Sequence, residues 1–243
     1  MFDERTGLLA PDGRVVMVSG ANRGFGLAIA KRLHADGYRL SLGARKLDAL
    51  KEAVAGFADA RVLQCRFDAG DPDSARDWVE RTVKHFGRLD GLVNNAGILR
   101  LHDLDDYDEK AFDEVLEVNL KAPYRLTVAA LPHLRKSGAG RIVNINSRSG
   151  LRYVAGSADY NISKFAGIAL NHAPRVEYWA EGVRTTAVCP GPSATEMNAD
   201  AVAQGRDLTH PATIAALVSL AIGLPNNASV PILPVCSDLE AGV

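Results

Sequence analysis

Apolar and polar residues follow two alternating patterns along this chain. Short β-branched or apolar runs, bounded by glycine and polar residues, are typical of buried strands, and the longer amphipathic stretches between them are typical of helices. The strands are expected at Val15–Ser19, Arg39–Gly43, Arg61–Phe67, Gly91–Asn94, Arg141–Ser147, Arg184–Cys189 and Pro231–Val235. The helices are expected at Gly24–Asp36, Leu47–Gly56, Pro72–Phe86, Asp108–Ser137, Ser157–Ala180 and Pro211–Leu224.

This alternation of strand and helix predicts a doubly wound α/β fold. Parallel neighbours need a crossover, so we expect a mostly parallel sheet of about seven strands with helices on both faces. No linker rich in proline, glycine or serine divides the chain, which predicts one domain over residues 1–243. Ligands of open parallel sheets bind beyond the carboxyl ends of the strands, so the candidate chemistry lies just after each strand.

Composition and charge exclude several classes of partner. The chain is 47% hydrophobic and has a formal net charge of -1, with 28 Lys and Arg against 29 Asp and Glu. No overall field attracts nucleic acid or an anionic membrane, and neither is expected as a partner.

Cysteine usage and the N-terminus predict a cytoplasmic protein. Cys65, Cys189 and Cys236 lack metal-ligand spacing and are expected to be reduced and buried, and the six histidines are scattered singly, so no metal is expected. The N-terminal residues lack the apolar core of a signal peptide, and no run reaches the roughly 18 apolar residues of a membrane span.

A glycine-rich loop follows the first long strand. In "SGANRGFG", Gly20, Gly24 and Gly26 open the next helix, where a tight turn and free N–H groups suit a pyrophosphate. The alternative is an ordinary strand-to-helix turn. The candidate cofactor residues of this loop are Gly20, Asn22, Arg23, Gly24, Phe25 and Gly26.

The second strand indicates which nicotinamide cofactor is bound. The segment Gly37–Leu47 has no Asp or Glu, the residue that binds the ribose 2′-hydroxyl of NAD, and instead contains Arg45 and Lys46. A guanidinium such as Arg45 or Arg23 fits a 2′-phosphate. We therefore expect NADP(H), with NAD(H) less favoured; the alternative is that these bases only decorate a solvated helix start.

Several motifs further along the chain complete a pattern. Asn94–Gly97 ends the fourth strand, Asn119 lies in an amphipathic stretch, and Ser147 ends the fifth strand, with Tyr160 thirteen residues later and Lys164 four after that. With Asp68 and "PGPSAT" at residues 190–195, this order resembles the short-chain dehydrogenase/reductase family of Tyr-x-x-x-Lys oxidoreductases with a Rossmann fold. The resemblance covers roughly four-fifths of the chain.

The residues themselves suggest the chemistry. Tyr160 and Lys164 share one helix face, and an ammonium nearby lowers the pKa of a phenol from about 10. Tyr160 is then a general acid for carbonyl reduction and a general base for alcohol oxidation, and Ser147 donates to the substrate oxygen. Each residue taken alone has a structural alternative: Ser147 as a strand-end cap, Tyr160 as a core residue and Asn119 as a partner at a helix kink.

The resemblance implies further roles. Lys164 would hold the nicotinamide ribose, and Asn119 would anchor a water in a proton relay. Asp68 would meet the adenine, the backbone near Ser193 the carboxamide, and the Thr195 hydroxyl the carboxamide or a phosphate, beside a cis-like or rigid turn. The remaining cofactor candidates are Asn95, Ala96, Gly97, Pro190 and Gly191.

The substrate end of the chain is less informative. A lid is expected at about residues 195–209; it is short and polar, which argues against a large steroid or lipid substrate. Arg100, Arg148 or Arg152 could favour a carboxylate or phosphate, the alternative being an interface or solvent. Leu99, Ser149, Leu151 and Tyr153 are further pocket candidates. The C-terminus lacks the Asp-Gly-Gly signature of many relatives and resembles carbonyl reductases of small hydroxy acids or aldehydes.

These observations predict an NADP(H)-dependent carbonyl reductase or secondary alcohol dehydrogenase acting on a small molecule. The alternatives are an NAD-dependent dehydrogenase working in the oxidative direction and a catalytically silent NADP(H)-sensing protein on the same fold. The resemblance also implies a homodimer or homotetramer that assembles through the helices bearing Asn119 and Tyr160.

Overall fold

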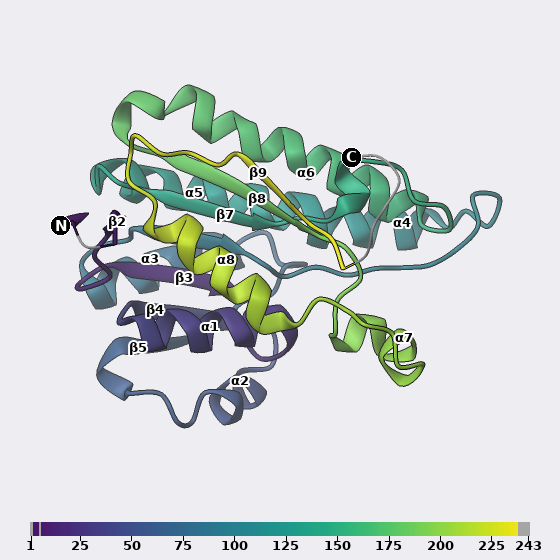
Figure 1. Cartoon of the computed structure of the whole chain (residues 1–243), viewed down its shortest axis with the longest axis horizontal. Coiled ribbons are helices and arrows are strands. Elements are labelled where there is room, and N and C mark those ends of the chain that lie inside the picture. The colour runs from purple at the N-terminus through teal and green to yellow at the C-terminus, as the bar shows by residue number, and fades with distance from the viewer. Residues whose placement is uncertain (1, 5, 238–243) are drawn as a thin grey trace.

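A seven-stranded parallel sheet forms the centre of the molecule (Figure 1). The computed structural model describes residues 2–4 and 6–237. The sheet order is β5-β4-β3-β6-β7-β8-β9, and every neighbouring pair is parallel. Its strands are β3 (Val15–Ser19), β4 (Arg39–Ala44), β5 (Val62–Arg66), β6 (Gly91–Asn94), β7 (Arg141–Ile145), β8 (Arg184–Pro190) and β9 (Ile232–Val235). The predicted doubly wound α/β fold is confirmed.

Helices cover both faces of this sheet (Figure 1). Their bounds are α1 (Gly24–Asp36), α2 (Leu47–Ala53), α3 (Ser74–Phe86), α4 (Glu109–Leu116), α5 (Ala122–Lys136), α6 (Ala158–Glu177), α7 (Ala199–Ala203) and α8 (Pro211–Gly223). One apolar cluster packs α1, α2 and α8 on one face, and a second packs α3 and α5 on the other. Burial of these two faces supplies the main driving force for folding.

The strand order places the candidate site. The chain runs outward from β3 through β4 to β5 and then returns to add β6 on the other side of β3. This reversal leaves a crevice at the carboxyl ends of β3 and β6, the position where open α/β sheets bind their ligands.

The prediction of one continuous helix over Asp108–Ser137 is wrong at residues 117–121. Between α4 and α5 the residues Glu117–Lys121 form a π-helical turn, and the Ala122 N–H donates to the carbonyl of Glu117, five residues back. Pro123 lies at the start of α5 and has no N–H to donate to the residue four places before it, Asn119. The regular α-helical hydrogen bonding is therefore interrupted where Asn119 projects.

Several other boundaries and features differ from the prediction. The fifth strand ends at Ile145 rather than Ser147, and an antiparallel pair, β1 (Phe2–Asp3) and β2 (Leu8–Leu9), was not predicted. Of the cis-like or rigid turn expected after β8, the cis form is not found, because the described residues contain no cis peptide. Cys65 and Cys189 are buried as expected, but Cys236 is exposed just after the edge strand β9.

Buried arginines fasten the amino-terminal edge of the sheet. Arg141, at the start of β7, donates to the carbonyl oxygens of Leu224 at 2.7 and 2.9 Å and of Gly182 at 3.0 Å, and to Asn226 Oδ1 at 2.8 Å. Burial, with the charges of Arg14 and Arg184, lowers the pKa of Arg141 to about 9. One guanidinium thus joins β7 to the segment between α8 and β9.

Within residues 2–4 and 6–237, none of the helices combines the length and the apolar character that a membrane span needs.

Candidate active site

Ser147, Tyr160 and Lys164 meet at the carboxyl edge of the sheet. The Lys164 Nζ lies 5.3 Å from the centroid of the Tyr160 ring, and the Ser147 side chain lies close enough to the Tyr160 phenol to lower its pKa. Nζ donates to the carbonyl oxygen of Ile145 at 3.1 Å. The last residue of β7 therefore fixes the ammonium, and the serine two residues later lies beside the phenol.

Close backbone approach holds β7 and α6 together at this point. The Asn146 side-chain amide donates to the carbonyl oxygen of Lys164 at 3.1 Å. A Cβ placed on Gly150 would lie 2.6 Å from that same oxygen, so the turn after Ser147 packs directly on the helix only because this residue is glycine. The distance between Ser147 and the first turn of α6 is thereby set by backbone rather than by flexible side chains.

Burial dominates the ionisation of the site. Desolvation raises the pKa of Tyr160, an effect that its hydrogen bond with Ser147 opposes. Desolvation also lowers the pKa of Lys164 to about 8. The expectation that Lys164 lowers the pKa of Tyr160 is therefore wrong for the chain alone: the phenol keeps its proton at neutral pH, as a general acid requires.

Asn119 connects three segments around this site. Its Oδ1 accepts from the Ile98 N–H at 2.8 Å, and its Nδ2 donates to the Ile98 carbonyl at 2.9 Å and to Ser163 Oγ at 3.1 Å. Ser163 in turn donates to the Tyr160 carbonyl at 2.7 Å. The amide is thus committed to holding the loop after β6 against α6, a positional task that sequence reasoning did not identify; the proton relay stays a prediction.

The glycine loop has the shape of a phosphate cradle. Gly20 has a φ of +66°, and a Cβ on Gly26 would lie 2.1 Å from the Gly20 carbonyl oxygen, so neither position accepts a side chain without rearrangement. Arg23 precedes α1 without a side-chain cap, and the first turn carries no acid. The free N–H groups and positive end of α1 therefore suit an anionic group. Asn22 is partly buried, and Phe25 packs on the core instead.

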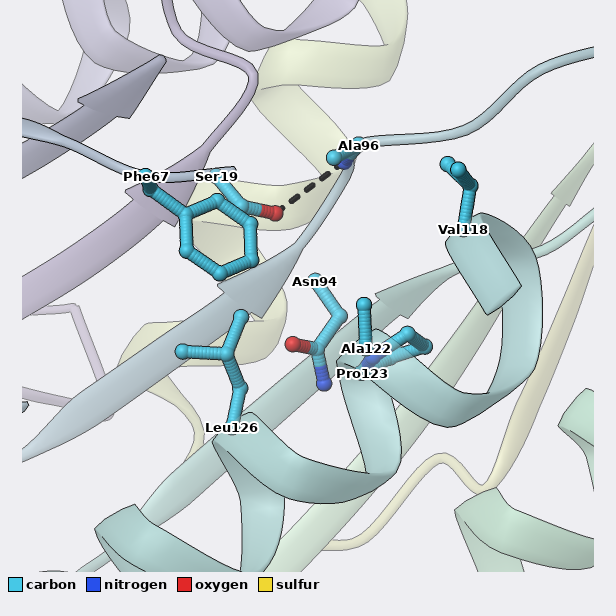
Figure 2. Close-up of a pocket in the computed structure, with 8 residues that line it drawn as sticks. All are labelled: Ser19, Phe67, Asn94, Ala96, Val118, Ala122, Pro123 and Leu126. Atoms are coloured by element: carbon cyan, nitrogen blue, oxygen red, sulfur yellow. Dashed lines mark hydrogen bonds between the residues drawn. The ribbon is translucent and has the colours of Figure 1, made fainter. Parts of the chain in front are cut away.

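Asn95 and Ala96 join this loop to the end of β6. The Ser19 hydroxyl accepts from the N–H groups of Asn95 at 2.9 Å and Ala96 at 3.0 Å, and the Asn95 amide donates to the Ser19 carbonyl at 2.8 Å. Figure 2 shows the Ser19–Ala96 contact above a small pocket, with Asn94 beneath. The pocket measures about 10 Å³ and is too small for a cofactor. These bonds shape the floor of the crevice.

A second small cavity, of about 20 Å³, lies beside Lys164 and is lined by the amides of Asn94, Asn119, Asn144 and Asn146. Asn94 Oδ1 and Asn146 Oδ1 are buried and have no hydrogen-bond partner within the described part of the chain. Such a polar cavity has room for one water molecule.

Basic side chains gather at the ends of β4 and β5. Arg45 is exposed directly after β4, and the exposed Arg66 is in register with Ala44 on the neighbouring strand. Arg66 Nη2 lies 3.1 Å from Asp68 Oδ2, while Arg23 pairs with Glu196 of the lid. Arg66 and Glu196 were missed by sequence reasoning, because strand register and the path of the lid decide these contacts.

The lid starts beside the glycine loop. Pro190 ends β8, and the next residue, Gly191, donates its N–H to the Val235 carbonyl at 2.8 Å. Ser193 is buried with its hydroxyl turned to the Gly191 carbonyl at 2.9 Å, and it forms a β-bridge with Thr209. A Cβ on Gly24 would lie 4.0 Å from Thr195 Cγ2, so the Thr195 methyl group lies beside the glycine loop, and a contact of its hydroxyl with the carboxamide or a phosphate stays a prediction.

The other predicted site residues fall around these centres. A Cβ on Gly97 would lie 3.3 Å from Asn119 Oδ1 and 3.9 Å from Lys164 Nζ, which places Gly97 between the two. Arg100 pairs with Glu114, Arg148 is buried next to Ser147, and Arg152 is exposed.

Comparisons with known proteins agree with this arrangement. The family model described as short chain dehydrogenase matches residues 14–206. The chain is 43% identical over 219 residues to an agropine synthesis reductase of Rhizobium rhizogenes, covering 89% of this chain and 51% of that protein. It is 35% identical to levodione reductase of Leifsonia aquatica, covering 76% of this chain and 71% of that enzyme.

A solved structure is similar over nearly its full length. The short chain dehydrogenase of Burkholderia cenocepacia J2315 in complex with NADP superposes with a TM-score of 0.86 at 32% identity, covering 94% of this chain and 98% of that one. The chain spans about half the length of the agropine synthesis reductases it matches. With the family model covering most of the sheet and the candidate site, this chain belongs to the short-chain dehydrogenase/reductase family of oxidoreductases.

Proposed function

We propose that this chain is an NADP(H)-dependent carbonyl reductase acting on a small molecule. The observation that carries the proposal is the meeting of Ser147, Tyr160 and Lys164 beside an uncapped, glycine-rich phosphate cradle. A bound nicotinamide would supply the hydride. Gly20, Gly26 and the start of α1 would hold its pyrophosphate, with Asn95–Gly97 lining the crevice and the segment from Pro190 to Thr195 near the nicotinamide.

The side chains can supply the proton that carbonyl reduction needs. Because burial keeps the pKa of Tyr160 raised, its hydroxyl carries the proton that a carbonyl oxygen needs as it becomes an alcohol. Ser147 would donate a hydrogen bond to that oxygen while negative charge develops on it. The matched relatives named as reductases agree with this direction.

The basic residues support NADP(H). Arg45 follows β4 and Arg66 ends the neighbouring strand β5, as the register of Ala44 with Arg66 shows, and the segment Gly37–Leu47 contains no carboxylate to repel a 2′-phosphate. The similar Burkholderia cenocepacia enzyme has NADP bound. Arginine binds phosphate with two parallel hydrogen bonds, which accounts for the proposed preference.

A carbonyl panel tests the proposed function. NADPH or NADH would be mixed with the protein and with 2,3-butanedione, ethyl pyruvate, glyceraldehyde or benzaldehyde, and cofactor absorbance followed at fixed pH. We expect turnover of at least one carbonyl and faster turnover with NADPH. NADPH binding without oxidation by any carbonyl, together with no reduction of NADP⁺ by the corresponding alcohols, would favour the silent sensor instead.

Replacing Arg45 with alanine is expected to weaken NADPH binding by roughly 10-fold or more, because one charge-assisted phosphate contact is lost, and to leave NADH binding unchanged. Fluorescence titration of both cofactors measures the two constants. Arg39→Ala is the matched control, since Arg39 is also exposed and begins the same strand that Arg45 follows. Equal losses for NADH and NADPH would contradict a 2′-phosphate contact.

The exposed faces of α5 and α6 support assembly as a homodimer or homotetramer. Tyr124 and Val128 on α5 and Ile162 and Phe165 on α6 are 45 to 56% exposed, an unusual display of large apolar groups on two helices. We propose that a second copy of the chain covers them.

Phe165→Glu is therefore expected to halve the mass measured by light scattering, because a carboxylate would be buried without a partner in the interface. Leu104→Glu changes an exposed loop residue in the same way and should leave the mass unaltered. An unchanged mass in Phe165→Glu would place the interface elsewhere.

A further inference from the structure

The loop after β6 contains a strap, residues 98–102, that is anchored at both ends. At its start, the Ile98 N–H and carbonyl are both bonded to the Asn119 side chain. At its end, the His102 N–H donates to the Gly156 carbonyl at 3.1 Å, and His102 forms a parallel β-bridge with Ser157. The strap thus runs from Gly97, next to Lys164, to the first turn of α6.

The His102 ring makes two contacts that constrain its protonation. Nδ1 lies 2.8 Å from the Asp103 carbonyl oxygen, and Nε2 lies 3.0 Å from Asp159 Oδ2. Asp159 is 3% exposed and directly precedes Tyr160. Nε2 and Oδ2 are buried and form no hydrogen bond with any other described atom. The attraction between the two charges is therefore what offsets the cost of burying these polar atoms.

A neutral imidazole does not satisfy both contacts. A carbonyl oxygen only accepts, so Nδ1 must carry a proton to bond Asp103. The neutral ring with that tautomer presents a lone pair from Nε2 to the carboxylate of Asp159, and two electron-rich atoms then face each other at 3.0 Å. Only the doubly protonated ring donates to one group and attracts the other.

We propose that His102, as an imidazolium, is a positioning residue that fastens the strap to the first turn of α6 beside Tyr160. The strap begins at Gly97, where a Cβ would lie 3.9 Å from Lys164 Nζ, and it carries the pocket candidates Leu99 and Arg100, so its anchoring would shape one wall of the substrate site. Tyr160 itself stays held by Ser147 and by the helix. Release of the anchor should therefore raise the KM for the carbonyl more than it lowers kcat. This consequence rests on the proposed function.

Surrounding charges favour the protonated ring. The hydrogen bond to the Asp103 carbonyl is the largest cause of a raised pKa of His102, followed among the raising effects by Asp159 of α6 and Asp106 of the same loop. Burial acts in the opposite direction. Tyr107 also faces the Asp159 charge, and its own pKa is raised, so it stays neutral. The anchor is thus complete below the ordinary histidine pKa of about 6.5 and is lost as pH rises through the raised value.

Two measurements test the anchor without any substrate. A proton NMR titration of the His102 ring, assigned with His102→Gln, should give a pKa above about 6.5 that falls in Asp159→Asn. At neutral pH, the backbone amide of residue 102 should exchange its hydrogen roughly 10-fold faster in His102→Gln than in the unmodified protein. An ordinary pKa, or one that Asp159→Asn leaves in place, would overturn the proposal, whatever the protein catalyses.

Kinetics with 2,3-butanedione and NADPH test the consequence. In the unmodified enzyme the KM should rise about threefold or more between roughly pH 6.5 and pH 8.5. His102→Gln should show, at both pH values, the KM that the unmodified enzyme has at about pH 8.5. His102→Lys, whose ordinary pKa of about 10.4 lies above this range, should stay closer to the KM that the unmodified enzyme has at about pH 6.5. A KM of His102→Gln that follows pH as the unmodified enzyme does would refute the role, while absent turnover in every form would count against the proposed function alone.

Discussion

Tyr160→Phe is expected to lower kcat by roughly 10³-fold, within the range that positioned general acids contribute. The change removes only the hydroxyl, so the ring below the Lys164 ammonium and the packing of α6 are retained. NADPH affinity should stay within about threefold, because binding draws on the glycine loop and the basic strand ends. Initial rates with 2,3-butanedione and a fluorescence titration with NADPH separate the two quantities.

Tyr124→Phe provides the matched control for this substitution. Tyr124 is 56% exposed on α5, and its phenol takes no part in the proposed site, so kcat should be unchanged. If Tyr160→Phe kept more than a tenth of the unmodified turnover, the assignment of Tyr160 as the proton donor would be wrong.

Arg141→Met is expected to destabilise the fold by about 4 kcal/mol, because several buried acceptors lose their charged donor together. Those acceptors are the carbonyl oxygens of Leu224 and Gly182 and the Asn226 side chain. In a domain of this size that loss corresponds to a Tm lower by roughly 10 °C. Thermal unfolding followed by circular dichroism measures the change.

Arg39→Met deletes an exposed arginine at the start of β4 and should shift the Tm by less than about 2 °C. A comparable small shift in Arg141→Met would mean that water replaces the lost donors and that the guanidinium does not fasten this edge of the sheet.

The sheet was predictable because the strands are short, strongly apolar and separated by amphipathic stretches. Packing on both faces of a parallel sheet imposes that pattern on the sequence itself. The interruption between α4 and α5 was missed because the amphipathic pattern continues through it, although Pro123, which has no N–H, was a signal for it. The contact of the Asn119 side chain with Ile98 was not predictable, because the folded chain alone brings the loop after β6 close to this turn.

The positions of the catalytic residues were predictable from the sequence, but their electrostatics were not. Strand ends of a parallel sheet share one edge, so Ser147 was expected near the helix that carries Tyr160 and Lys164. The direction of the Tyr160 pKa was not predictable, since desolvation depends on the final packing. Likewise Arg66 became a cofactor candidate only through its register with Ala44, and the contact of His102 with Asp159 only through the folded loop.

The β-bridge between Ser193 and Thr209 closes the loop at residues 195–209, so the sequence of this loop can change without a change in the sheet. Ala194 donates to the Thr209 carbonyl at 3.0 Å, so the two ends of the lid already meet without help from the residues between them. Lengthening a closed loop is cheap, at about 0.6 kcal/mol for each doubling. If residues 195–209 cover the substrate as we expect, they form an exchangeable segment: replacing them should change the substrate preference while the proton-transfer residues keep their positions.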